Sequence, residues 1–194
     1  MSAPLAEMPP AQRHAVIAEG FAEQIAAVDD WDAPTPVAGW VARDVVSHLI
    51  DWFPGFLSAG GVHLPGVPDV ADDPAAAWDA RRRDIATLLD GPAAGEAFTH
   101  PMIGEFRLAD AIDMFYTADV FMHTWDLSAA AGRDAHLDPE FAAQLHAGMR
   151  GMEEVLRSSG QYGPAVPVPA DADPVTALIG FIGRDPAWAP TATI

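Results

Sequence analysis

The chain has 194 residues, half of them apolar, which is enough for a single domain with a sizeable core over residues 1–194. Its formal net charge of −18 would repel phosphate backbones and anionic lipids, and its lack of cysteine excludes disulfides, cysteine-bound metals and a cysteine nucleophile. Without a long apolar run or a secretory leader, the sequence predicts a cytoplasmic protein that binds neither nucleic acid nor membranes.

The first third of the chain predicts two helices joined by an irregular connection. Residues 5–28 form the first helix, because apolar side chains recur there at spacings of three and four residues. These side chains are Ile17, Phe21, Ile25 and Val28. Residues 31–40 contain two prolines and a glycine, which is typical of a connection. The second helix begins at Val41, and Pro54 followed by Gly55 should end or kink it.

The middle of the chain predicts a long loop, a third helix and an irregular stretch. Residues 58–74 are rich in glycine, proline and acidic side chains, and a loop of this length is typical of a lid or a binding loop. Residues 74–90 predict a helix whose polar face includes the three arginines at 81–83. Residues 90–108 are irregular. Two short extended pieces are expected within them, at residues 97–100 and 105–108.

The last part of the chain predicts two more long helices and a short one. The fourth helix covers residues 108–131 and should end at Gly132, a typical C-terminal cap. The fifth covers residues 138–157, with Asp138 at its N-cap. A proline-rich segment then leads to a short helix at residues 174–183. Helices joined by irregular loops, with few strands, predict an all-α bundle.

The fourth helix carries a pair of polar side chains beside its apolar stripe. Asp119 and His123 are four residues apart, so they share one face, with Cβ atoms about 6 Å apart. This spacing allows a carboxylate and an imidazole to bind one metal ion, or simply to stabilise a turn at the solvent edge. The pair flanks the stripe and should therefore point into the bundle or along its seam. The stripe consists of Ala111, Phe115, Ala118, Met122, Trp125 and Ala129.

A histidine on the second helix could complete a metal site. His48 shares a face with Val45 and Leu49, so it should point inward. An inward histidine is either a hydrogen-bonded core residue or a ligand. Together with Asp119 and His123 it would form a His/Asp/His site that leaves positions open for water or substrate, as catalytic metal sites do.

Other polar and aromatic residues admit two roles each. Asp126, three residues after His123, would either orient that imidazole through its other nitrogen or help to end the helix. Asp51, one turn after His48, is either an acceptor for that ring or a surface residue. The remaining histidines are expected in solvent (His14, His136 and His146) or in loops at a pocket mouth (His63 and His100). Five large side chains are expected either to line a pocket or to pack in the core: Trp40, Trp52, Tyr116, Met122 and Trp125.

Three motifs resemble one known group of proteins. "PTPVAGWVARDVVSHL" (34–49) and "ADVFMHTWDLSAAAG" (118–132) resemble the two metal-binding motifs of the DinB-like metalloenzyme superfamily, in its branch of mycothiol-dependent maleylpyruvate isomerases. "ALIGFIGRDPAW" (177–188) resembles the Gly-Arg-Asp-Pro-x-Trp ending of a single-domain, largely actinobacterial subgroup of that branch. The three matches occur in the expected order and span most of the chain.

The resemblance implies a DinB-like four-helix bundle with long irregular connections and an extra C-terminal segment. It also implies a divalent metal ion, zinc or alternatively nickel, held by His48, Asp119 and His123, and mycothiol, a low-molecular-weight thiol, as a co-substrate. The chain departs from the isomerases at Asp119, where they have glutamate, and at Val41, where a serine or threonine usually caps the helix. We expect no second domain of the kind that those isomerases have.

The function expected from these features is metal-dependent thiol chemistry. A metal-bound thiol would act on a small electrophilic substrate, with isomerisation or S-transfer as the result, and Asp126 is the catalytic candidate beside the ligands. One alternative is a hydrolase or lyase that uses metal-activated water. Another is a non-catalytic bundle that binds a metal or a small ligand, with a second copy of the chain as its candidate partner.

Overall fold

The computed structural model describes residues 3–158 and 162–190, and these are predominantly helical, as the predicted all-α class requires. The helices are η1 (Leu5–Glu7), α1 (Pro10–Ile25), α2 (Ala42–Ala59), α3 (Pro74–Asp90), η2 (Pro92–Gly95), α4 (Leu108–Ala111), η3 (Ile112–Thr117), α5 (Ala118–Ala130), α6 (Pro139–Arg150), α7 (Glu153–Ser158) and α8 (Pro174–Phe181). A two-stranded antiparallel sheet joins β1 (Ala97–His100) to β2 (Gly104–Arg107). The predicted single domain also includes residues 1–2, 159–161 and 191–194, which lie outside the described residues.

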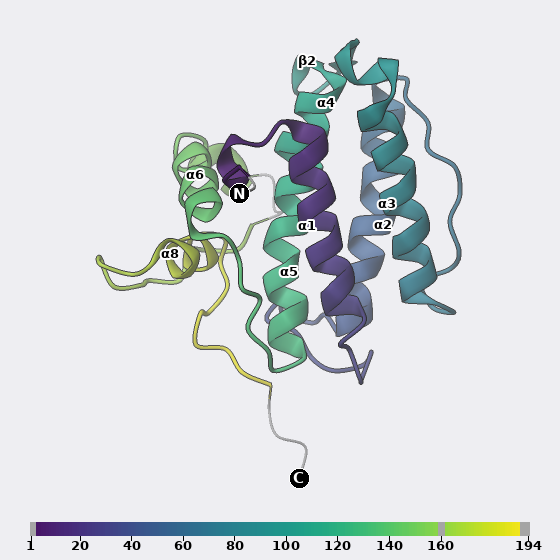
Figure 1. The fold of residues 1–194 in the computed structure, drawn as a ribbon. Helices are drawn as coiled ribbons and strands as arrows, with labels where there is room; N and C mark the ends of the chain where they lie inside the picture. The colour runs from purple at the N-terminus through teal and green to yellow at the C-terminus, as the bar shows by residue number, and fades with distance from the viewer. Residues whose placement is uncertain (1–2, 159–161, 191–194) are drawn as a thin grey trace.

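Four long helices, α1, α2, α3 and α5, lie side by side (Figure 1). Helix α1 packs against α3 and α5, and α2 packs against the same two helices, so that the four surround one core. Apolar side chains from all four fill it, because each helix buries one stripe of its surface. The largest of these side chains include Phe21, Phe53, Trp78, Leu49 and Leu127.

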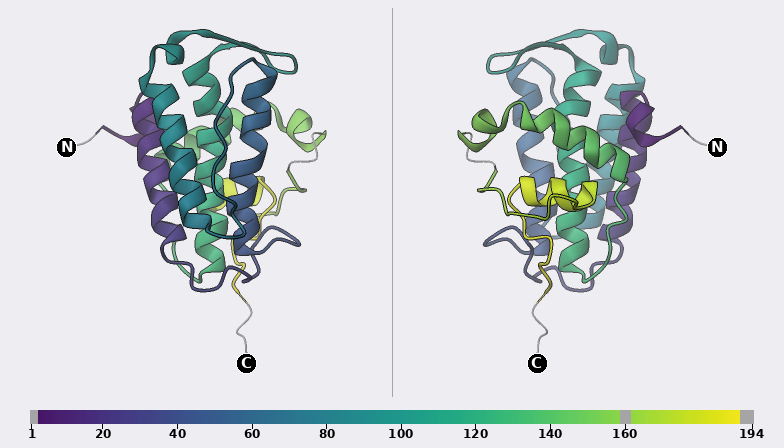
Figure 2. Two further views of the ribbon diagram at one scale, coloured as in Figure 1. Left: turned by 90° about the vertical axis from the view of Figure 1, so that its right-hand side faces the viewer. Right: turned by 90° about the vertical axis from the view of Figure 1, so that its left-hand side faces the viewer.

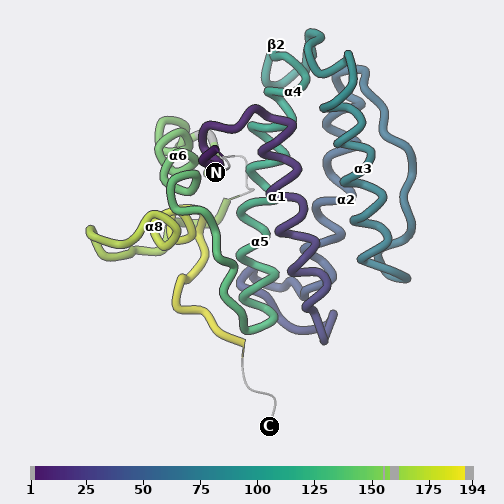
Figure 3. The backbone as a smooth tube through the Cα atoms, viewed as in Figure 1, coloured from purple at the N-terminus to yellow at the C-terminus, as the bar shows by residue number. Residues whose placement is uncertain are grey.

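The long loop predicted at residues 58–74 is a crossover at residues 60–73, which follows the outside of the bundle from the end of α2 to the start of α3 (Figures 2 and 3). Arg43 of α2 donates a hydrogen bond to the carbonyl of Ala71 (3.1 Å), and Arg81 of α3 donates one to the carbonyl of Pro65 (3.3 Å). Arg81 is therefore buried, and its predicted place on a solvated polar face is wrong, because the loop covers it.

Two proline positions behave differently from the prediction. Helix α1 begins at Pro10 and not at residue 5, and a short 3-10 turn, η1, precedes it. Proline is tolerated at a first helical position because its missing N–H has no partner there in any case. Pro54 lies inside α2 without ending it, since the helix continues to Ala59. Phe53 and Leu57 are fully buried around it, and their packing holds the helix together.

The predicted fourth helix consists of three consecutive segments, α4, the π-helix η3 and α5. A π-turn has wider i→i+5 hydrogen bonds, so it rotates every later side chain relative to a regular helix. Downstream of it, Trp125 is half-buried, whereas His123 and Asp126 are buried. The predicted apolar stripe is therefore only partly inside, and the neighbouring stripe with the polar residues faces the core.

The C-terminal elements lie across one side of the bundle, as the right-hand view of Figure 2 shows. Helix α6 packs against α8, and Phe141 of α6 meets Phe121 of α5 edge-on at 4.9 Å between ring centroids. The predicted N-cap is present, since Asp138 accepts a hydrogen bond from the backbone N–H of Phe141 (2.8 Å). The predicted fifth helix is divided into α6 and α7, and α8 ends at Phe181, two residues before its predicted end.

Among the described helices none is both long enough and apolar enough to span a membrane. The predicted extended piece at 97–100 coincides with β1. The second piece is β2 at 104–107, one residue earlier than predicted, because Leu108 already begins α4.

Candidate metal centre

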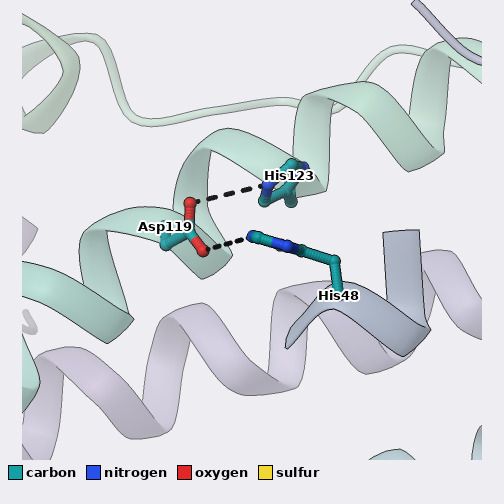
Figure 4. Close-up of side chains that lie close together, drawn as sticks. All are labelled: His48, Asp119 and His123. Atoms are coloured by element: carbon teal, nitrogen blue, oxygen red, sulfur yellow. Dashed lines mark hydrogen bonds and ion pairs between the residues drawn. The ribbon is translucent and has the colours of Figure 1, made fainter. Parts of the chain in front are cut away.

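Three side chains from two helices converge between α2 and α5. His48 comes from α2, whereas Asp119 and His123 come from α5 (Figure 4). Each offers one ligand atom, and these three atoms lie within 4.8 Å of one another. The tertiary structure thus brings together the three ligands that the sequence suggested.

The distances within this cluster suit a small divalent ion. Nε2 of His48 lies 3.1 Å from Oδ2 of Asp119, and Nε2 of His123 lies 3.5 Å from Oδ1 of the same carboxylate. Tetrahedral zinc has ligand bonds of about 2.0–2.2 Å, which places its donor atoms about 3.3 Å apart. Two imidazoles and one carboxylate are also a donor set that zinc and nickel accept. The residues present therefore fit a metal ion of this kind.

The cluster is open to solvent on one side. The side chain of His48 is 31% exposed, that of Asp119 is 17% exposed and that of His123 is 6% exposed. The ligand from α2 is thus more exposed than the two from α5. His48 is therefore the most solvent-exposed member of the cluster, and His123 is the most buried.

The connection before α2 places an aromatic ring over the cluster. The hydroxyl of Thr35 donates to the carbonyl of Trp40 (3.1 Å), and Gly39 adopts the positive φ of +81° that such a tight turn requires. The indole of Trp40 stacks on His123, with 5.8 Å between ring centroids and 15° between planes. It also lies 5.1 Å from the ring of His48. Trp40 is therefore a wall of the site, one of the two roles expected for it.

The start of α2 is held without a side-chain cap. Val41 occupies the N-cap and has no side-chain acceptor, as its sequence predicted. The carboxylate of Asp44 accepts a hydrogen bond from the backbone N–H of Val41 (2.9 Å), which is half of a capping box. This contact secures the first turn of the helix that carries His48.

Trp52, one turn after His48, contacts Asp119. Its indole N–H donates a hydrogen bond to Oδ2 of Asp119 (3.0 Å). Burial raises the pKa of Asp119, but the charge of His123 and the hydrogen bonds from His48 and Trp52 together hold this pKa below its ordinary value. Asp119 is therefore kept as a carboxylate, the form that binds a metal ion.

Asp126 contacts the other nitrogen of His123. It has no exposed surface, and its Oδ2 lies 2.8 Å from Nδ1 of His123. Arg184, which follows α8, donates from Nε to Oδ1 (3.2 Å) and from Nη2 to Oδ2 (3.0 Å) of this carboxylate. Because α5 continues to Ala130, Asp126 does not end the helix and has the orienting position that was the first of its two expected roles.

Burial and neighbouring charges shift the pKa values of Asp126 and His123 in opposite directions. Burial raises the pKa of Asp126, but the hydrogen bond and charge of His123 and the charge of Arg184 hold it below its ordinary value. Burial lowers the pKa of His123, but Asp119 and Asp126 raise it further than burial lowers it. Arg184 was not among the candidates from the sequence, and its place in the "GRDPAW" motif was the only signal for it.

The remaining histidines lie elsewhere, and two predictions for them are wrong. His14 is buried, and its Nδ1 lies 2.9 Å from the hydroxyl oxygen of Thr117, so it is not solvent-facing. Burial lowers the pKa of His14 to about 4. His100 is buried in β1, where it stacks on Phe56 at 4.6 Å between ring centroids, instead of lying at a pocket mouth. His63 and His136 are exposed, and His146 is half-buried beside Phe181.

The other candidates divide between surface, core and site. Asp51 is exposed on α2, as a surface residue would be. Tyr116 is fully buried, and its hydroxyl donates to the carbonyl of Leu49 (3.1 Å), so it is a core residue. Tyr162 was missed by the sequence analysis. Burial raises the pKa of its phenol, and the charge of Asp119 raises it further.

Comparison with known proteins gives relatives but no activity. No family model matches the chain, and no solved structure matches it. The chain is 30% identical over 185 residues to the uncharacterized protein Rv0738 of Mycobacterium tuberculosis strain ATCC 25618 / H37Rv, and the match covers 91% of this chain and 98% of the relative. The same values hold for the uncharacterized protein MT0763 of strain CDC 1551 / Oshkosh. The chain belongs to the family of these two mycobacterial proteins.

Proposed function

We propose that the protein is a divalent-metal-dependent enzyme of the DinB-like superfamily, which uses a low-molecular-weight thiol on a small electrophilic substrate. The observation that carries the proposal is the convergence of His48, Asp119 and His123, with three ligand atoms within 4.8 Å of one another. The packing of α1 and α2 against both α3 and α5 supports the four-helix bundle that the sequence motifs imply. Three protein ligands leave a coordination position open, as catalytic sites do.

A bound zinc ion, or nickel in its place, would lower the pKa of a thiol in the open position, so that the thiolate predominates near neutral pH. The chain has no cysteine, so the thiol comes from outside, and mycothiol is the co-substrate that the motifs suggest. The sulfur would add to an electrophilic carbon of the substrate. Expulsion of the thiolate after rotation about the former double bond would complete an isomerisation, whereas return of the thiol's proton to the neighbouring carbon, with the sulfur retained, would complete an S-transfer.

The residues of the chain would position and shield the reactants. Asp119 is held in its ionised form by its hydrogen bonds, and His123 is held by the carboxylate of Asp126. The rings of Trp40 and Trp52 flank the cluster and present apolar surface to the thiol and substrate. Because His48 is the most exposed of the three ligands, the reactants would enter from its side.

The first experiment is elemental analysis of protein purified without a histidine tag. We expect about one equivalent of zinc or nickel per chain in the wild type and little in His48→Ala. His63→Ala is the matched control, because His63 is exposed and its ring contacts only Ser58 in the described residues. Wild-type protein that binds no divalent metal, even after reconstitution, would contradict the proposal.

The second experiment measures turnover of an electrophilic reporter by the metal-loaded protein, with and without mycothiol. Thiol-dependent turnover that is lost in His48→Ala is the expected result. Turnover without any thiol would instead indicate metal-activated water, and thus a hydrolase or lyase. Metal binding without turnover under either condition would indicate a non-catalytic metal-binding protein.

A further inference from the structure

Arg184 connects the C-terminal segment to the candidate metal centre. Its guanidinium binds both oxygens of Asp126 across 58 residues of sequence, from Nε to Oδ1 (3.2 Å) and from Nη2 to Oδ2 (3.0 Å). This two-point contact fixes the plane of the carboxylate as well as its position. The third guanidinium nitrogen donates to the carbonyl of Ile182 (3.1 Å), which fixes the arginine itself.

The end of α8 directs Arg184 towards α5. Gly183 adopts a φ of +88°, its N–H bonds the carbonyl of Gly180 (3.1 Å), and the N–H of Arg184 bonds the carbonyl of Ile179 (3.0 Å). These two bonds and the left-handed glycine form a Schellman motif, which reverses the chain at the end of a helix. A Cβ at Gly183 would also lie 3.0 Å from the carbonyl oxygen of Pro164, so the turn requires glycine on both counts.

Arg184 is a cationic partner of the buried carboxylate of Asp126. A carboxylate without exposed surface needs an opposite charge and hydrogen-bond donors, since water cannot solvate it. Arg184 supplies both through two donors. Oδ2 of Asp126 can accept a further hydrogen bond, and it lies 2.8 Å from Nδ1 of His123. A negative charge 2.8 Å from Nδ1 attracts the imidazole proton to that nitrogen, and a proton on Nδ1 leaves the lone pair of the ring on Nε2.

We propose that Arg184 is a positioning residue of the candidate metal centre, which acts through Asp126 to fix the ring of His123 with Nδ1 protonated and Nε2 directed towards Asp119 and His48. This inference rests on the proposed metal site. The C-terminal "GRDPAW" motif then has two roles. Gly183 shapes the turn after α8, and Arg184 contacts Asp126 from outside the four long helices.

The variants that test the inference are Arg184→Gln, Arg184→Lys and Arg157→Gln. The glutamine removes the guanidinium, whereas the lysine keeps one positive charge without the two-point contact. Arg157→Gln is the matched control. Arg157 also anchors the C-terminal segment, through the carbonyls of Gly163 and Phe181, but the described hydrogen bonds and ion pairs of its side chain do not include Asp126.

The first readout is nitrogen NMR of the histidine rings in metal-free protein, at an alkaline pH where His123 is neutral. The His123 signals are assigned by their loss in His123→Gln. We expect a protonated Nδ1 in the wild type and in Arg157→Gln, a mixture of the two tautomers in Arg184→Gln, and an intermediate result in Arg184→Lys. An unchanged tautomer in Arg184→Gln, or an equal change in Arg157→Gln, would overturn the inference.

The second readout is the dissociation constant for Zn²⁺, measured by competition with a chromophoric chelator. Loss of an outer-shell partner of a metal-binding histidine typically weakens metal binding by about 10–100-fold, and we expect this for Arg184→Gln. Arg157→Gln should bind as the wild type does. Equal weakening of Zn²⁺ binding in both variants would show that Arg184 only anchors the C-terminal segment, which would contradict the inference. If the wild type bound no metal, the proposed function would fail, while the tautomer experiment would still decide whether Arg184 positions His123.

Discussion

The indole N–H of Trp52 and the imidazole of His48 meet the same carboxylate oxygen, Oδ2 of Asp119, at 3.0 Å and 3.1 Å. Trp52 and His48 are four residues apart, so one face of α2 provides both contacts. An indole N–H is a donor only and cannot accept a proton from the carboxylate. Trp52 therefore stabilises the ionised form of Asp119 and sets the direction of one of its oxygens.

Replacement of Trp52 by phenylalanine should weaken metal binding. The variant keeps an aromatic wall but removes the donor to Asp119, and we expect the dissociation constant for Zn²⁺ to rise by about tenfold or more. Competition with a chromophoric chelator measures it. Trp78→Phe is the control, because that indole donates to the carbonyl of Ala18 (3.2 Å) in the core. Equal affinities of Trp52→Phe and the wild type would contradict the role given to Trp52.

Metal binding should stabilise the folded chain against heat. A ligand present at about 100 times its dissociation constant stabilises the state that binds it by about 2.7 kcal/mol. For a chain of this size each kcal/mol shifts the melting temperature by about 2–4 °C, so we expect a shift of roughly 5–10 °C between chelated and zinc-saturated protein. His48→Ala should show no shift and His63→Ala the full shift. Calorimetry of the three proteins, each with chelator and with zinc, makes this comparison, and a full shift in His48→Ala would exclude His48 as a ligand.

His14 should make stability depend on pH. Burial lowers its pKa in the folded protein to about 4, from 6.5 in the reference state, so between these values the unfolded chain binds a proton that the folded chain does not. The stability that comes from neutral His14 is complete above about pH 6.5 and is lost as the pH falls towards 4. The loss approaches about 1.4 kcal/mol per pH unit, or about 3 kcal/mol in all.

The variant His14→Gln isolates this contribution, because glutamine does not titrate. Its free energy of unfolding should fall less steeply than that of the wild type between pH 6.5 and pH 4. Urea unfolding at several pH values measures both slopes, and the other titrating groups cancel in the difference. Parallel curves for the two proteins would show that His14 does not carry this proton linkage.

Two glycine-to-alanine variants should have opposite effects on stability. A Cβ at Gly180 of α8 would lie 2.7 Å from Cγ1 of Val168 and 2.8 Å from the carbonyl oxygen of Val166, so Gly180→Ala should cost about 1–3 kcal/mol by overpacking. A Cβ at Gly148 of α6 meets no atom within 4 Å, so Gly148→Ala should stabilise the protein by about 0.5–1 kcal/mol through helix propensity. Urea unfolding measures both. Greater stability in Gly180→Ala than in Gly148→Ala would contradict the packing of α8.

Features that depend on neighbouring residues in sequence were predictable. Asp119 and His123 share a face because an α-helix repeats every 3.6 residues, and Asp138 caps α6 because its carboxylate reaches a backbone N–H three residues later. Such patterns need no knowledge of the rest of the fold. They also indicated correctly that His48 lies on an inward face of α2.

Features that depend on contacts between distant segments could not be predicted from the sequence. His14 lies on α1 at a position that reads as polar, and only the packing of η3 against α1 buries it beside Thr117. The π-turn in η3 has no recognisable sequence signal, yet its wider hydrogen bonds rotate the side chains that follow it relative to a regular helix.

The sequence by itself determined the predominantly helical class and the candidate ligand types, because propensity, periodicity and side-chain chemistry are local properties. Only the tertiary structure placed His48 against Asp119 and brought Arg184 to Asp126 across 58 residues. A buried charge is stable only beside its partner, and the partner's position depends on how whole segments pack. The residue types of the candidate site could thus be read from the sequence, whereas their geometry required the fold.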